Sequence, residues 1–193
     1  MEAYRIGIKF YLSSGSDVDP ETWFRVLNTW IPVSTEEILI DVADYSHVHN
    51  GPVTLLVGYE ANYGIDSSNG RAGLLYTRKQ PLTGDMGERI RSCIGDALKA
   101  CRRLEQEEDL KGSVVFDGGE LEIILNDRLN APNTAETFSA LQPALNSVLD
   151  GLYGGAQTQI EHDDDPRRRF AVRIKIEGDW EVDNVLENMS IAL

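Results

Sequence analysis

The chain has 193 residues, of which 41% are hydrophobic and 26% are charged, proportions that are ordinary for a globular protein with a packed core. Its net charge of −14, from 32 acidic and 18 basic residues, argues against a nucleic-acid partner and against an anionic membrane surface. Residues 1–12 contain neither a basic stretch nor a continuous apolar run, so we expect a cytoplasmic protein without a secretory signal.

Alternating apolar residues predict strands over 4–12, 36–45, 53–65 and 71–79. In 36–45, Ile38, Ile40 and Val42 are predicted to share one face. In 53–65, one predicted face, which places its tyrosines in the core or at an interface, is formed by Val53, Leu55, Val57, Tyr59, Ala61, Tyr63 and Ile65. Further along the chain, Gly118-Gly119 predicts a tight turn that makes a hairpin of 114–125, and a last hairpin runs over 157–177.

Helices are predicted between these strands from their capping residues and their apolar periodicity. Asp19 with Pro20 begins the first helix, and Asp85 with Glu88 forms a capping box at the start of a long helix over 85–108. A third helix follows the polar loop 126–134, and Asp179 precedes a fourth.

The two cysteines, Cys93 and Cys101, lie eight residues apart in the long helix. At about 1.5 Å per residue they are about 12 Å apart, whereas a disulfide needs Cα atoms within about 7 Å. We therefore expect two buried free thiols and a reducing compartment.

The predicted order is β α β β β α β β α β β α, which is typical of an α+β two-layer sandwich. The sheet is expected to be mainly antiparallel, with helices covering one face and leaving the other open. We predict a single compact domain over 1–193. Two ferredoxin-like pseudo-halves, 1–111 and 112–193, are an alternative description of the same order.

Two histidines close together suggest a metal site. If the segment around them is extended, His47 and His49 point to the same side and could share a divalent ion with Asp41 or Asp44. Glu60 would then be the general base of a metal-assisted hydrolase. The alternative is a polar connection that turns at Gly51-Pro52 and binds nothing. No other cofactor is predicted.

The loop 126–134 is a second candidate site, because it leads into the amino end of a helix, where anions are stabilised. Arg128, Asn130, Asn133 and Thr134 could bind a carboxylate or a phosphate there. The alternative is that the same residues only cap the helix. Three aspartates and three arginines in 163–169 predict a hairpin tip whose opposite charges face each other across the strands.

No nucleotide-binding, hydrolase or metalloprotease motif occurs in the sequence. We therefore expect a protein of binding or protein-interaction type without catalytic activity, which associates with itself or with another protein. The metal-assisted hydrolase and the small-anion site are the alternatives.

Overall fold

The computed structural model describes residues 3–13, 18–48 and 52–191. Its elements, in chain order, are β1 (Ile6–Leu12), α1 (Pro20–Val33), β2 (Leu39–Asp44), β3 (Pro52–Gly58), β4 (Ala61–Asp66), the 3₁₀ turn η1 (Ser68–Gly70), β5 (Gly73–Arg78), α2 (Met86–Gln106), the 3₁₀ turn η2 (Glu108–Leu110), β6 (Phe116–Leu125), α3 (Ala135–Tyr153), β7 (Thr158–His162), β8 (Phe170–Ile176) and α4 (Val182–Ile191). Within these residues, no helix combines the length and the apolar character that crossing a membrane requires.

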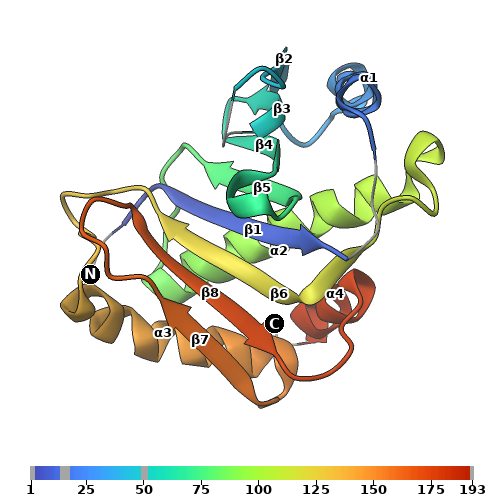
Figure 1. Ribbon diagram of the computed structural model, residues 1–193. Coiled ribbons are helices and arrows are strands. Elements are labelled where there is room, and N and C mark those ends of the chain that lie inside the picture. The colour runs from blue at the N-terminus through green and yellow to red at the C-terminus, as the bar shows by residue number, and fades with distance from the viewer. Residues whose placement is uncertain (1–2, 14–17, 49–51, 192–193) are drawn as a thin grey trace.

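All eight strands of the described residues belong to one antiparallel sheet with the order β2-β3-β4-β5-β1-β6-β8-β7 (Figure 1). The first strand in the chain, β1, therefore lies in the middle of the sheet, between β5 and β6. β2 and β7 form the two edges. The α+β class predicted from the sequence is confirmed, but the division into two ferredoxin-like halves is not.

The helices pack on one face of the sheet. α1 contacts β2 and β3, α2 contacts β1 and β5, and α3 and α4 contact α2 (Figure 1). Inward side chains of the strands, such as Ile8, Leu74 and Ile123, meet the apolar stripes of the helices in a single core cluster. The opposite face of the sheet carries no helix among the described residues, and we call it the open face.

Two helix starts follow from local chemistry, as predicted. The Asp19 side chain accepts a hydrogen bond from Thr22 N–H at the start of α1. At the start of α2, the side chains of Asp85 and Glu88 each accept from the backbone N–H of the other, which completes the capping box. Both cysteines are buried and free, as expected.

The predicted strand 53–65 was wrong in its length. The chain turns at Tyr59 and Glu60, and the two parts pair with each other as β3 and β4. Because the turn shifts the alternation by one residue, Leu56 faces the core in β3 whereas Tyr63 does so in β4. Tyr59 was predicted to share a face with Tyr63, but Tyr63 is buried and Tyr59 is 53% exposed.

The hairpin predicted at Gly118-Gly119 was also wrong, because both glycines lie within the continuous strand β6. Because these two glycines have no side chain, the segment at Trp180, which precedes α4, can pack closely against β6. Gly118 N–H donates to Trp180 O at 2.8 Å, and a Cβ added at Gly118 would lie 2.7 Å from the same oxygen. Sequence alone does not separate a glycine needed for a turn from one needed for close packing.

β2 departs from the predicted alternation as well. A bulge between Leu39 and Asp41 shifts its register against β3. Leu39 and Val42 therefore face the core, and Ile40 lies outward with 56% of its surface exposed.

Candidate functional site

The open face of the sheet carries a buried polar network at its centre. Lys9 on β1 points away from the helices and forms an ion pair with Asp66, with Nζ 2.5 Å from Oδ2. Lys9 Nζ also donates to Arg71 O at 2.8 Å, and Ser68 Oγ donates to Asp66 Oδ2 at 2.5 Å. These contacts hold the segment around η1 over β1. Because this segment covers Lys9, the lysine is only 2% exposed although it lies on the open face.

Arg71 extends the network to β6, where its guanidinium donates two hydrogen bonds to the carboxylate of Glu120. This pairing lowers the pKa of Glu120. The guanidinium also lies over the ring of Tyr11, 4.2 Å from its centroid. Tyr11 O–H donates to Glu122 Oε2 at 3.2 Å, and burial followed by the charge of Glu122 raises the Tyr11 pKa to about 12.

Beside this network, the loop 126–134 and the hairpin tip 163–169 are held against each other. Asn133 Nδ2 donates to Asp163 O at 2.6 Å and to Asp165 O at 2.9 Å. Arg128 donates to Arg167 O at 2.8 Å. His162 is fixed at the base of the tip, because its Nε2 lies 2.9 Å from Asn133 Oδ1 and its ring stacks 5.0 Å from Phe138.

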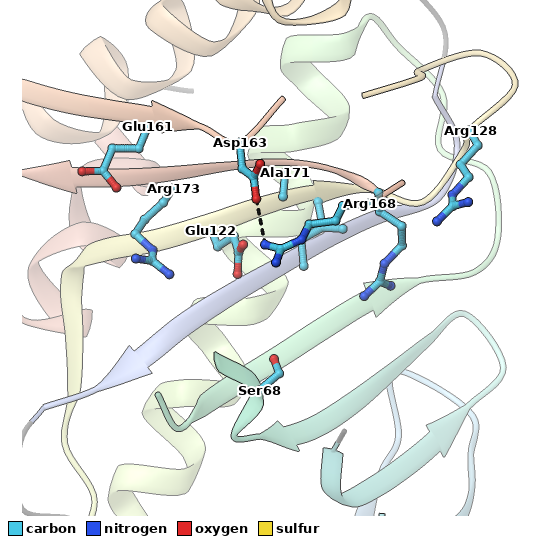
Figure 2. Close-up of a pocket in the computed structure, with 10 residues that line it drawn as sticks. Ser68, Glu122, Arg128, Glu161, Asp163, Arg168, Ala171 and Arg173 are labelled. Atoms are coloured by element: carbon cyan, nitrogen blue, oxygen red, sulfur yellow. Dashed lines mark hydrogen bonds and ion pairs between the residues drawn. The ribbon is translucent and has the colours of Figure 1, made fainter. Parts of the chain in front are cut away.

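A cavity of about 670 Å³ opens between these loops and the network (Figure 2). It is lined by Ser68, Glu122, Ile124, Arg128, Glu161, Asp163, Arg168, Arg169, Ala171 and Arg173. We call it the arginine pocket, because four arginines face three carboxylates there although acidic residues greatly outnumber basic ones in the whole chain.

The charges of the arginine pocket are unevenly distributed. At one end, Arg173 on β8 lies between its cross-strand partners Glu122 on β6 and Glu161 on β7. At the other end, Arg128 and Arg169 flank the point where β6 ends and β8 begins (Figure 2 labels Arg128).

The arginines at this second end differ in their partners. Arg168 NH1 is paired with Asp163 Oδ2 at 2.7 Å. Neither Arg128 nor Arg169 forms an ion pair with any described residue. This end of the cavity therefore holds two guanidinium groups that make no ion pair within the described part of the chain.

The four residues predicted to bind an anion are only partly brought together. Arg128 lines the arginine pocket. Thr134 caps α3, and Asn133 ties the two loops together. Asn130 donates to both carboxylate oxygens of Asp127.

The residues predicted to bind a metal do not converge where the structure describes them. Asp41 and Asp44 belong to opposite faces of β2, because Asp41 pairs with Val57 and Asp44 with Thr54. His47 is exposed and stacks on Tyr45. Outside residues 1–2, 14–17, 49–51 and 192–193, no group of three potential ligands could hold a metal ion. His49 lies outside the described residues, so the metal site stays a prediction.

Glu60, the predicted general base, lies at the opposite end of β3 from His47, roughly 20 Å along the strand. It lines a second cavity of about 230 Å³, where β4 and β5 meet α2. Tyr63 O–H donates to Glu37 Oε2 there at 2.8 Å, and burial raises the pKa of Glu37. One oxygen of Glu60 is enclosed without a hydrogen-bond partner among the described residues.

Sequence reasoning missed most of the open-face site. Lys9 was visible as a polar position in an alternating strand, but Asp66 and Arg71 follow it by 57 and 62 residues. No local pattern links such positions, because strand pairing decides which of them meet. The opposite charges of the hairpin tip pair as predicted, but they do so within the loop between β7 and β8 and not across the strands. Arg167 pairs with Asp165, and Arg168 pairs with Asp163.

Comparison of the chain with models of known protein families and with curated proteins found no match.

Proposed function

We propose that the chain is a non-catalytic binding protein that holds a small anion in the arginine pocket. One observation carries the proposal: Arg128 and Arg169, from separate loops, line the same cavity without an ion-pair partner in the described residues. Guanidinium groups suit this role, because their planar array of donors matches a carboxylate or a phosphate.

The rest of the cavity limits the ligand. Glu122 and Glu161 lie at the end away from Arg128, where they would repel a second negative group. We therefore propose a ligand with one anionic group whose remainder is neutral or cationic. The cavity volume of about 670 Å³ is within the range for sites that hold small molecules.

Binding without catalysis is the function that the titratable groups support best. Tyr11 is the ionisable hydroxyl next to the cavity, but its pKa of about 12 keeps it protonated at neutral pH. Its proton is donated to Glu122. Neither group is therefore arranged as a free nucleophile or base.

The proposal can be tested by thermal unfolding with inorganic phosphate and with acetate, each compared with sodium chloride at equal ionic strength. A ligand at a hundred times its Kd adds roughly 2.7 kcal/mol, which corresponds to a rise in Tm of roughly 5–10 °C for a chain of this size. We expect a rise with one of these anions, and its loss in Arg169→Gln and Arg128→Gln.

Arg102→Gln is the matched control. The substitution removes the same charge, but Arg102 lies on α2 in the helix layer, away from the arginine pocket. If that variant abolishes the rise equally, or if sodium chloride produces the same rise, the arginine pocket is not the anion site.

A further inference from the structure

Most of the exposed large apolar side chains belong to α1, to β2 and to the segments next to β2 and β3. Seven of the nine in the described residues lie between residues 24 and 59: Phe24, Val33, Ile38, Ile40, Tyr45, Val48 and Tyr59. Ile38 precedes the edge strand β2 and Ile40 lies in its bulge, and they are 62% and 56% exposed. Clustered apolar exposure of this kind marks interaction sites, whereas scattered single residues do not.

The two edges of the sheet differ in how they are protected. The opposite edge, β7, exposes the polar residues Gln159 and Glu161. β2 contains neither lysine nor proline, the residues that commonly blunt an edge strand. The Val42 N–H of β2 donates to Asp41 Oδ1 at 2.8 Å.

The stretch of chain that forms β2, β3 and β4 is also acidic. Residues 26–70 contain six acidic residues and no lysine or arginine. A cavity of about 520 Å³ between the start of α1 and the end of β2 is lined by Asp19, Pro20, Glu21, Phe24 and Asp44. Hydrogen bonds from Thr22 and Ser46 lower the pKa values of Asp19 and Asp44, so both are charged at neutral pH.

Asp19 and Asp44 accept local backbone hydrogen bonds, but the negative charges of this cavity have no cationic partner among the described residues. None of Asp19, Glu21 and Asp44 forms an ion pair with a described residue. Phe24, in the same cavity, is 37% exposed, and its ring could contact a cation directly. The cavity thus offers negative charge, an aromatic ring and space for a long cationic side chain.

We propose that the acidic edge, formed by Phe24, Ile38, Ile40, Asp41 and Asp44, docks an extended segment of a partner protein that alternates apolar and basic residues. The apolar side chains of that segment cover Ile38 and Ile40, and a lysine or arginine enters the cavity beside Asp44. A second copy of the chain fits this edge less well, because pairing two such edges would bring like charges together.

A labelled peptide of alternating lysine and valine, titrated with the full chain and followed by fluorescence anisotropy, tests the proposal. We expect this peptide to bind and a glutamate–valine peptide not to bind. Asp44→Asn keeps an oxygen for the Ser46 N–H and should weaken binding about threefold, the size typical of one exposed charge pair. Ile40→Lys should abolish binding.

Two matched controls separate docking from general attraction to an acidic protein. Asp150→Asn removes an exposed charge from α3, and Leu129→Lys changes the exposed apolar side chain of the loop 126–134. Both should bind the peptide as the wild type does. Equal weakening in these controls, or no binding by the wild type, would overturn the proposal.

Sedimentation of the wild type alone provides the remaining decisive result. If the chain forms a dimer that Ile40→Lys dissociates, a second copy covers the acidic edge and the proposal is wrong. The arginine pocket lies near the other edge strand, so each of the two proposals can fail without the other.

Discussion

Lys9 and Asp66 form an ion pair on the face of the sheet that no described helix covers, and both side chains are nonetheless buried. The pair joins the middle strand β1 to the end of β4, and the segment that follows β4 lies over it. Burying two opposite charges is only stable when both are present and hydrogen-bonded. The pair therefore fixes the segment around η1, which contributes Ser68 to the arginine pocket.

Asp66→Asn should destabilise the protein by about 3–5 kcal/mol, because it leaves the Lys9 ammonium buried without its counter-charge. The free energy of unfolding in urea measures this loss. Asp109→Asn is the control, since Asp109 pairs with Arg25 in solvent and its loss should change stability by less than about 1 kcal/mol. In Lys9→Met/Asp66→Asn, part of the lost stability should return. Equal effects of the two single asparagine variants would contradict this account.

Glu37→Gln should change how stability depends on pH. Burial raises the Glu37 pKa above its ordinary value of 4.5, so the native state binds more protons than the unfolded chain at pH values just above 4.5. The stability contributed by protonated Glu37 is thus present below pH 4.5 and is lost as pH rises through the native pKa. Urea unfolding between about pH 4 and pH 7 should show the wild type losing stability relative to Glu37→Gln.

Glu36→Gln provides the comparison, because Glu36 is the exposed neighbour. The pH dependence of the Glu37→Gln difference is compared with that of the Glu36→Gln difference over the same range. If the two differences change with pH in the same way, the carboxyl of Glu37 does not titrate as a buried group.

Gly118→Ala should destabilise the protein by about 1–3 kcal/mol, since its new methyl group would overlap Trp180 O. Gly7→Ala is the matched variant, in the neighbouring strand β1, where the added carbon would meet its nearest neighbour at an ordinary 3.4 Å. Thermal unfolding should therefore give a clearly lower Tm for Gly118→Ala than for Gly7→Ala. The reverse order would mean that the Trp180 segment moves aside at little cost.

Both thiols should be unreactive in the folded protein. Burial raises the Cys93 pKa to about 12 and the Cys101 pKa well above its usual range, so almost no reactive thiolate exists at pH 8. An aromatic disulfide reagent should react with neither until urea unfolds the chain. Ser92→Cys, an exposed neighbour on α2, should react at once. Rapid reaction of the wild type without urea would show that α2 opens locally.

The features that sequence predicted correctly depend on residues close together in the chain. The helix caps at Asp19 and Asp85 need three or four residues each, and the buried stripe of α2 needs only its own periodicity. The features that it missed depend on pairing across the sheet. The turn at Tyr59, the bulge before Asp41 and the packing of Gly118 on Trp180 all require knowledge of the partner strand or loop.

The same distinction applies to the sites. Arg128 was identified because the amino end of a helix can be recognised from nearby residues. The neighbours of Arg173 lie on β6 and β7, and only strand pairing brings them together. The charged hairpin tip was read correctly as paired, but Arg169 next to it remains without such a partner in the described ranges. Its position beside Arg128 depends on Asn133, which ties the two loops together.

The central position of β1 has a consequence for the order of folding. β1 pairs with β5 on one side and with β6 on the other, and β6 ends at Leu125. During synthesis, β1 to β5 can assemble while one side of β1 still exposes its backbone donors and acceptors. We expect the helix α2, made between β5 and β6, to cover the growing core first, and the pairing of β6 to follow as a late, slow step over a long sequence separation.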